Sequence, residues 1–154
     1  PIIARSYLNN PEATAANIPG GELRTGDVGY MNEDGWLFII DRVKDMINSS
    51  GYKVWPREVE DVLYRHPAVM EAAVVGAPDE YRGETVAAFV SLKDGQQASE
   101  DELISYCRER LAAYKAPHSV TFIDEVPKNA SGKILRREVR RTAAEAAEAS
   151  GTAG

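Results

Sequence analysis

The sequence has little of what marks a secreted, metal-binding or membrane-spanning protein. One cysteine and two histidines occur among 154 residues, so an internal disulfide is impossible and a reducing compartment is suitable. His66 and His118 are far apart in the chain and lack neighbours with metal-ligand spacing, so we expect no metal site. No apolar run approaches the roughly 18 residues of a membrane-spanning helix, and no secretory signal is apparent. We therefore expect a cytoplasmic protein without a membrane span.

Basic residues are outnumbered by acidic ones, 18 to 24, and six of the 18 lie in one stretch. The formal net charge of -6 gives no general reason to expect a nucleic-acid partner. Residues 127–141 nevertheless carry one acid, Glu138, against six basic residues, which are Lys128, Lys133, Arg136, Arg137, Arg140 and Arg141. Such a stretch indicates either a local anion site or partner surface, or only a solvated helix face, and charge alone favours the solvated face.

The order of apolar and turn-forming residues predicts an α+β fold. From about residue 45 the pattern gives helix, strand, strand, helix, strand, loop and helix, which suits a small sheet covered by helices. Helices are expected to begin at Trp55-Pro56, at the capping box Ser99–Glu102 and near Leu135. Cys107 falls on the apolar face of its helix and is expected to pack in the core. Strands are expected over residues 72–75, 85–92 and 119–123, with a polar loop over 77–84.

A β-hairpin is expected ahead of this sheet. Residues 22–30 and 36–40 have strand character on either side of a turn at residues 32–35, and the first twenty residues have loop character. A two-stranded hairpin cannot bury a core of its own. We therefore expect residues 1–42 to be the edge of a larger N-terminal domain, residues 43–141 to form a C-terminal domain, and residues 142–154 to be an alanine-rich, partly disordered tail. Trp36 and Trp55 are expected to be packing anchors.

The loop from Pro127 to Lys133 carries the first candidate for chemistry. Its Gly132-Lys133 pair invites comparison with the phosphate-binding P-loop. However, Pro127 stands where that motif needs its first glycine, and Ile134 stands where it needs Ser or Thr. What remains is a lysine on a small, polar loop. A lysine ammonium suits the neutralisation of charge on a phosphate or carboxylate; the alternative is an ordinary exposed lysine.

Three further motifs could bind a nucleotide or a thin ligand. The segment Arg24-Thr25-Gly26-Asp27 places an aspartate at a strand end, where it can accept hydrogen bonds from ribose hydroxyls or simply form a turn. The segment from Asp41 to Asp45 holds four charges in five residues, so Arg42 could donate to hydroxyls or phosphate, or could belong to a surface ion-pair cluster. The segment from Ser49 to Glu60 contains Gly51, which permits a close backbone approach to a ligand or closes a turn.

Taken in order, these four motifs resemble the last core motifs of the adenylate-forming superfamily. That superfamily includes acyl-CoA synthetases, luciferases and peptide-synthetase adenylation domains. The resemblance extends over nearly all of residues 20–140, and residues 127–138, with the sequence PKNASGKILRRE, look most like fatty acyl-CoA ligases. It implies the mobile α+β C-terminal domain of such an enzyme, preceded by the edge of the large N-terminal domain.

The resemblance also implies roles for individual residues. In this family a carboxylate attacks the α-phosphate of Mg-ATP to give an acyl-AMP, and a thiol, usually that of CoA, then releases AMP. By resemblance, Asp27 and Arg42 bind the nucleotide, together with Tyr30. Lys133 stabilises charge in the adenylation step, and Lys44 is the hinge about which the C-terminal domain turns. The residues expected on the CoA side are Ser50, Gly51, Tyr52, Lys53, Arg82 and Lys115.

The cofactors and partners implied by the resemblance are ATP or AMP, CoA, Mg²⁺ and a carboxylic acid. Mg²⁺, adenine and the acid would be held mainly by the N-terminal adenylation domain, which this chain lacks. We therefore expect the 154 residues alone to have no ligase turnover. Two alternatives stay open: an adenylation enzyme that loads a carrier protein, and a regulatory role in which a protein acetyltransferase modifies Lys133.

Overall fold

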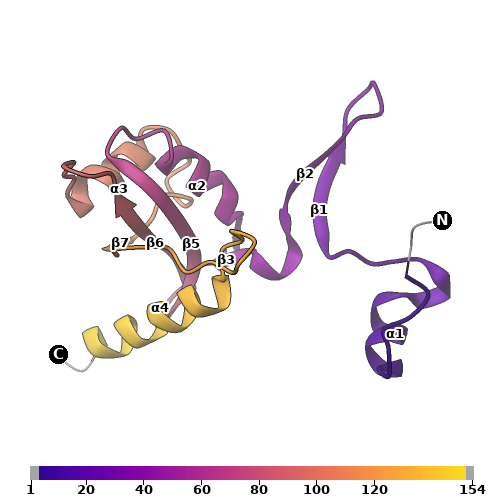
Figure 1. Cartoon of the computed structure of the whole chain (residues 1–154). Helices are drawn as coiled ribbons and strands as arrows, with labels where there is room; N and C mark the ends of the chain where they lie inside the picture. The colour runs from indigo at the N-terminus through magenta and orange to yellow at the C-terminus, as the bar shows by residue number, and fades with distance from the viewer. Residues whose placement is uncertain (1–3, 152–154) are drawn as a thin grey trace. The chain divides into compact units, whose positions relative to one another are not determined.

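The chain folds as two compact units, Pro1–Lys44 (unit 1) and Asp45–Gly154 (unit 2). The computed structural model describes residues 4–151 of them (Figure 1). The division between the units falls after Lys44, whereas the sequence placed the boundary after Arg42. The intervening residues belong to a short 3-10 turn that links the two units.

Unit 1 contains a short helix and a β-hairpin. The two strands pair antiparallel, with a bulge between Val28 and Gly29. Their register puts Asp27 opposite Arg42 at the open end of the hairpin. The elements in chain order are α1 (Pro11–Asn17), η1 (Pro19–Gly21), β1 (Asp27–Met31), β2 (Leu37–Arg42) and η2 (Val43–Asp45).

Three expectations for unit 1 were wrong. The supposed loop at the start contains α1, because the Asn10 side chain caps it by accepting from the Ala13 N–H at 2.9 Å and Pro11 occupies the first helical position. The first strand begins at Asp27 rather than at residue 22. Trp36 is 70% exposed and is no packing anchor, since it lies beside the hairpin turn, where the described residues of unit 1 provide no second layer.

The sheet of unit 2 has five strands. Their spatial order is β4-β3-β6-β5, with β7 also paired to β6. The long hairpin β5–β6 is antiparallel, whereas β7 runs parallel to β6. The strands are β3 (Ile47–Ser49), β4 (Tyr52–Val54), β5 (Val69–Asp79), β6 (Gly83–Leu92) and β7 (Ser119–Phe122).

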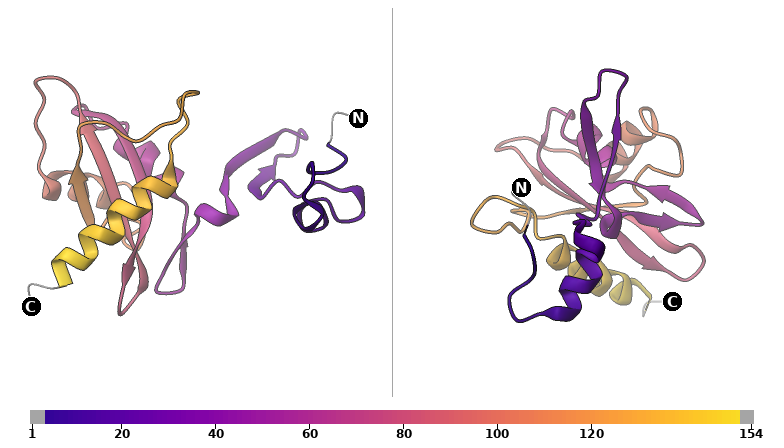
Figure 2. Two further views of the ribbon diagram at one scale, coloured as in Figure 1. Left: turned by 60° about the horizontal axis from the view of Figure 1, so that its bottom comes forward. Right: turned by 90° about the vertical axis from the view of Figure 1, so that its right-hand side faces the viewer.

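Helices cover both faces of this sheet (Figures 1 and 2). Helices α2 (Pro56–Leu63) and α3 (Glu100–Arg108) pack on one face, and α4 (Arg136–Gly151) packs on the other. Successive residues of β5 point to opposite faces, so Val74 belongs to the core under α2 and α3 while Val75 belongs to the core under α4. The α+β class expected from the sequence is confirmed.

The structure confirms the predicted starts of α2 and α3. Pro56 is the first residue of α2, and the capping box opens α3: Ser99 Oγ accepts from the Glu102 N–H at 3.1 Å, and Glu102 Oε2 accepts from the Ser99 N–H at 3.4 Å. Cys107 on α3 is fully buried, and burial raises the pKa of its thiol to about 11. This thiol is a packing group, as its place on the apolar face predicts.

Strand β5 lies at the edge of the sheet, and side chains satisfy part of its outer side. Glu60 Oε1 accepts from the Val74 N–H at 2.8 Å, and Arg136 Nη1 donates to the Val74 carbonyl at 3.0 Å. The Tyr64 hydroxyl donates to the Ala72 carbonyl at 3.3 Å. These side chains take the place that a neighbouring strand would otherwise fill.

Two expectations for unit 2 need correction. The polar loop over residues 77–84 is reduced to residues 80–82, because the Asp79 carboxylate closes the turn by accepting from the N–H groups of Tyr81 and Arg82 at 3.0 and 2.7 Å. The alanine-rich segment continues α4 as far as Gly151, as suits the best helix-forming residue. Residues 152–154, the last part of the tail over 142–154 that was expected to be partly disordered, lie outside the described residues.

In the part of the chain that the structure describes, no helix is both long enough and apolar enough to cross a bilayer.

Leu63→Ala should destabilise unit 2. The Leu63 side chain is fully buried between α2 and the sheet, and truncating a buried leucine costs roughly 2–5 kcal/mol. Urea unfolding of the 154-residue chain, followed by circular dichroism, should show a loss of this size. Leu8→Ala is the matched control, because Leu8 is 90% exposed; coincident curves for the two variants would contradict the packing.

Candidate functional site

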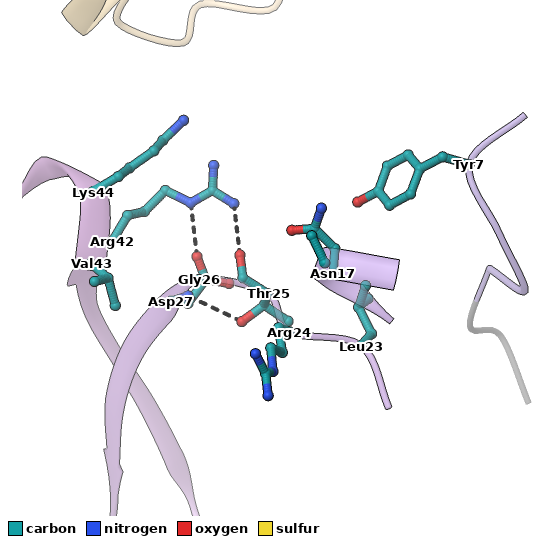
Figure 3. A pocket seen from close by; sticks show the side chains of 11 residues that line it. Tyr7, Asn17, Leu23, Arg24, Thr25, Gly26, Asp27, Arg42, Val43 and Lys44 are labelled. Carbon is teal, nitrogen blue, oxygen red and sulfur yellow. Dashed lines mark hydrogen bonds and ion pairs between the residues drawn. The ribbon is translucent and has the colours of Figure 1, made fainter. Parts of the chain in front are cut away.

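Asp27 and Arg42 form an ion pair at the open end of the hairpin in unit 1. Arg42 Nε donates to Asp27 Oδ1 at 2.9 Å, and Arg42 Nη2 donates to the Thr25 carbonyl at 3.3 Å (Figure 3). The Asp27 N–H in turn donates to Thr25 Oγ1 at 3.1 Å. The side chains of Arg42 and Asp27 are 39% and 31% exposed, so a ligand can reach the pair. Strand pairing thus unites two residues that the sequence singled out separately.

A cleft of about 720 Å³ opens beside this pair. Three cations and one carboxylate line it, which suits an anionic ligand. Tyr30, expected at the nucleotide, is not among the lining residues; it stacks on Phe38 further along the hairpin, with ring centroids 5.0 Å apart. The cleft is lined by Tyr7, Ala16, Asn17, Leu23, Arg24, Thr25, Gly26, Asp27, Arg42, Val43 and Lys44 (Figure 3).

Lys133 lies on a loop of unit 2 that one side chain holds in shape. Asn129 Oδ1 accepts three hydrogen bonds, from the Ser131 N–H at 3.0 Å, from Ser131 Oγ at 2.8 Å and from the Lys133 N–H at 2.9 Å. The Asn129 N–H donates back to the Lys133 carbonyl at 2.9 Å. Gly132 has a φ of 80°, which side-chain-bearing residues rarely adopt. The glycine before Lys133 therefore serves the loop geometry.

The Lys133 side chain is exposed. Within the described residues its ammonium has no ion-pair or hydrogen-bond partner. Lys128, on the same loop, differs: its ammonium contacts the Glu71 carboxylate, and that hydrogen bond raises the pKa of Lys128. Of these two lysines, Lys133 is the one whose charge can be offered to a ligand.

Most residues expected on the CoA side meet at one end of the unit 2 sheet. Ser50 and Gly51 form the turn of the β3–β4 hairpin with φ values of 52° and 85°, as a two-residue type I′ turn requires. The Ser50 N–H donates to the Arg82 carbonyl at 3.0 Å. Tyr52 stacks on Tyr114, with ring centroids 4.7 Å apart, which brings the neighbouring Lys115 to the same region.

The basic residues of this region differ in how far they are neutralised. Lys115 Nζ lies 2.6 and 2.7 Å from the two carboxylate oxygens of Glu58. Arg82 Nη1 lies 3.6 Å from Asp79 Oδ2, and the Arg82 N–H, with that side chain, holds the pKa of Asp79 below its usual value. Lys53 is exposed on β4.

A buried charge cluster at the start of α4 was not expected. It consists of Asp45, Glu60, Arg136 and Arg140, and the two acids are only 7% and 5% exposed. Arg136 Nη2 donates to Glu60 Oε2 at 2.9 Å, and Arg140 Nη2 donates to Asp45 Oδ1 at 2.9 Å. Arg136 Nε lies 3.7 Å from Asp45 Oδ2. Two basic residues of the 127–141 stretch are therefore bound to buried acids of their own chain.

One sequence signal could have revealed this cluster. Glu60 falls among Val59, Val62 and Leu63, which form the buried face of α2. A carboxylate on an apolar face is rarely buried without a cation. Arg136 and Arg140 are four residues apart and lie on one face of the basic helix α4. The sequence alone does not show that these two patterns come together in the folded chain.

Residues 58–133 of this chain match the family model described as the AMP-binding enzyme C-terminal domain. The chain belongs to this family. A long-chain-fatty-acid–CoA ligase of Bacillus subtilis (strain 168) is 52% identical over 139 residues, covering 90% of this chain and 25% of that protein. A 2-succinylbenzoate–CoA ligase of Geobacillus kaustophilus (strain HTA426) is 50% identical over 141 residues, covering 92% of this chain and 29% of that protein.

The likeness extends to the backbone of a solved member of the adenylate-forming enzymes. The o-succinylbenzoate CoA synthetase MenE from Bacillus subtilis, in complex with the acyl-adenylate intermediate OSB-AMP, superposes with a TM-score of 0.81 at 43% identity. The match covers 88% of this chain and 28% of that one. The chain thus carries the C-terminal domain of an adenylate-forming enzyme and spans 25% and 29% of the two curated relatives named above.

Asn129→Ala should loosen the Lys133 loop without unfolding unit 2. The substitution removes the acceptor of three hydrogen bonds, and each is worth about 0.5–1.5 kcal/mol. Amide hydrogen exchange, measured by NMR on the 154-residue chain, should accelerate about tenfold at Ser131 and Lys133.

Asn129→Asp is the matched variant, because a carboxylate oxygen can accept the same three bonds. It should keep exchange at Ser131 and Lys133 close to that of the unsubstituted chain. Equal acceleration in the Ala and Asp variants, or none in either, would show that the Asn129 oxygen does not shape this loop.

Proposed function

We propose that this chain is the C-terminal part of an AMP-forming acid–CoA ligase. The observation that carries the proposal is Lys133, an exposed ammonium on a loop shaped by Asn129, in a chain 52% identical to a CoA ligase over 139 residues. The reaction would join a carboxylic acid to CoA in two steps. ATP and the acid first give acyl-AMP and pyrophosphate, and the CoA thiol then takes the acyl group and AMP leaves.

Asp27 and Arg42 are proposed to bind the nucleotide in the cleft of unit 1. An ionised carboxylate can accept about four hydrogen bonds, so its pairing with Arg42 is compatible with accepting from a ribose diol. Arg42 holds the Asp27 carboxylate in place. The cations Arg24 and Lys44 in the same cleft suit a ligand that carries phosphate. Tyr30, on the same hairpin, is still proposed to contact the bound nucleotide.

Lys133 is proposed to act in the adenylation step. Negative charge gathers between the attacking carboxylate and the α-phosphate as the new bond forms. An ammonium placed there stabilises this charge more than it stabilises the separated reactants. Its long side chain and the small residues around it, Ser131 and Gly132, allow a close approach.

Lys44 is proposed to be the hinge between a large adenylation domain, of which unit 1 would be an edge, and unit 2 as the mobile domain. Among the described residues of unit 1, Ile18 is the one buried hydrophobic side chain. Tyr30, Met31 and Leu37 of the hairpin are 56%, 65% and 62% exposed. Apolar strands exposed to this degree are typical of a surface that another layer covers.

The acceptor is proposed to be free CoA, which would approach the turn at Ser50 and Gly51. The exposed stack of Tyr52 on Tyr114 and the exposed Lys53 offer groups for a nucleotide-bearing thiol. Arg82 and Lys115 lie nearby, and a CoA phosphate would have to compete there with their partners Asp79 and Glu58. The proposed acid is a fatty acid, after the Bacillus subtilis relative, and 2-succinylbenzoate is the second candidate, after the Geobacillus relative. A carrier-protein thiol is the alternative acceptor.

Mg²⁺ would accompany ATP in the full enzyme. Within residues 4–145, no group of three His, Cys, Asp or Glu side chains is arranged to hold a metal ion. Mg²⁺ is proposed to be held mainly through the N-terminal domain.

Lys133→Ala in the full-length protein should separate the two half-reactions. Pyrophosphate exchange into ATP that depends on palmitate or 2-succinylbenzoate should fall by about 10²–10³-fold, since one transition-state cation is lost. Formation of the thioester from a preformed acyl-adenylate and CoA should change little. Lys93→Ala, a lysine whose ammonium binds the Pro67 carbonyl at 2.8 Å, is the control and should leave both steps intact.

The same assays decide the proposed function as a whole. A full-length protein that forms no AMP with either acid, ATP and CoA would overturn the ligase proposal. Transfer to a phosphopantetheine carrier protein but not to CoA would favour the alternative acceptor. Ligation by the 154 residues alone would contradict the proposed need for an N-terminal domain.

A regulatory acetyltransferase is a second proposal, favoured by the exposure of Lys133 and its lack of an ion-pair partner among the described residues. Acetylation would remove the ammonium charge and with it the adenylation step. Mass spectrometry after incubation with candidate protein acetyltransferases should find acetyl groups at Lys133 in preference to Lys128, whose ammonium contacts Glu71. An unmodified Lys133 would count against this proposal.

A further inference from the structure

The buried charge cluster lies at a special point along the chain. Asp45 is the first residue of unit 2, and its carboxylate is bound by Arg140 at 2.9 Å. On the other side, the Val43 N–H donates to the Gly26 carbonyl at 2.9 Å inside unit 1. Lys44 is therefore the single residue between a backbone anchor in unit 1 and a side-chain anchor in unit 2.

The same cluster reaches the loop of Lys133. Arg136 follows Lys133 by three residues and is the first residue of α4. Its guanidinium is held by the Glu60 carboxylate at 2.9 Å and by the Val74 carbonyl at 3.0 Å, and its Nε faces Asp45 at 3.7 Å. One end of the Lys133 loop is thus tied, through a buried network, to the residue that follows Lys44.

Burial makes the network costly to open. The side chains of Asp45, Glu60 and Arg136 are 10%, 7% and 17% exposed, so water screens their charges poorly and each hydrogen bond is strengthened. Arg140, at 37%, is the partner nearest to solvent. Breaking one link takes a counter-ion away from a buried charge, which costs free energy.

We propose that Asp45, Arg136 and Arg140, together with Glu60, are positioning residues that set the distance from Lys44 to Lys133. A rotation at Lys44 would then carry Lys133 as part of one rigid body. This proposal rests on the proposed function, because it assigns the cluster to the adenylation step. None of the four residues need touch the substrate.

Arg140→Gln in the full-length protein tests the proposal. Acid-dependent exchange of pyrophosphate into ATP should fall about tenfold in rate with little change in the KM for ATP, because a displacement of about 1 Å at the reacting centre has effects of this size or larger. The thioester step from preformed acyl-adenylate, which does not use Lys133, should stay within about twofold. Arg141→Gln is the matched control on the same helix, with a side chain 72% exposed, and should alter neither step.

Combination with Lys133→Ala distinguishes positioning from general damage. If Arg140 acts through Lys133, adding Arg140→Gln to Lys133→Ala should lower adenylation no further. Equal losses in both half-reactions, an additive loss in the double variant, or no loss in Arg140→Gln would each overturn the proposal. Asp45→Asn should reproduce the Arg140→Gln pattern; should it fail to fold, Arg140→Gln alone decides.

A readout without the reaction separates this proposal from the proposed function. In the 154-residue chain, Arg140→Gln should accelerate amide hydrogen exchange about tenfold at residues 45–47 and at residues 133–135 together, since both ends of the network loosen. Arg141→Gln should accelerate neither. An inactive unsubstituted enzyme would refute the ligase function, whereas unchanged exchange in Arg140→Gln would refute the rigid link itself.

Discussion

Two buried carboxylates impose the main constraint on unit 2. Asp45 and Glu60 are buried, and each needs a cation, because an ion stripped of its partner inside a protein costs roughly 3–5 kcal/mol. Arg136 and Arg140 supply these cations from the first turns of α4. The position where α4 begins is therefore dictated by chemistry as well as by helix propensity. Where α4 begins also decides where the preceding loop, with Lys133, must end.

Local signals in the sequence were sufficient for much of this fold. The capping box at Ser99, the proline at the start of α2 and the apolar stripes of α2 and α3 are short-range patterns, and the structure confirms them. The failures were also local. Asn10 and Pro11 open a helix in a segment with few apolar residues, and Asp79 converts a polar stretch into a tight turn through two hydrogen bonds.

In the candidate site, too, the sequence predicted individual residues but not the long-range contacts between them. Ordered motifs singled out Asp27, Arg42 and Lys133, and the family match agrees with the resemblance on which their roles rest. The pairing of Asp27 with Arg42 depends on strand register across 15 residues. The bonds of Arg136 to Glu60 and of Arg140 to Asp45 join residues 76 and 95 positions apart. Only the packing of α4 on the sheet, which is a tertiary event, brings these groups together.

The outer side of β5 has a consequence for how molecules of this protein behave toward one another. An exposed strand edge is a template on which a second chain can extend the sheet, and proteins block such edges with charge or covering groups. In β5, Glu60 and Arg136 occupy the N–H and carbonyl of Val74, and Tyr64 occupies the carbonyl of Ala72. An incoming strand would have to displace a buried ion pair before it could bond to Val74. The network that steadies α4 therefore also opposes intermolecular β-sheet growth at the middle of this edge.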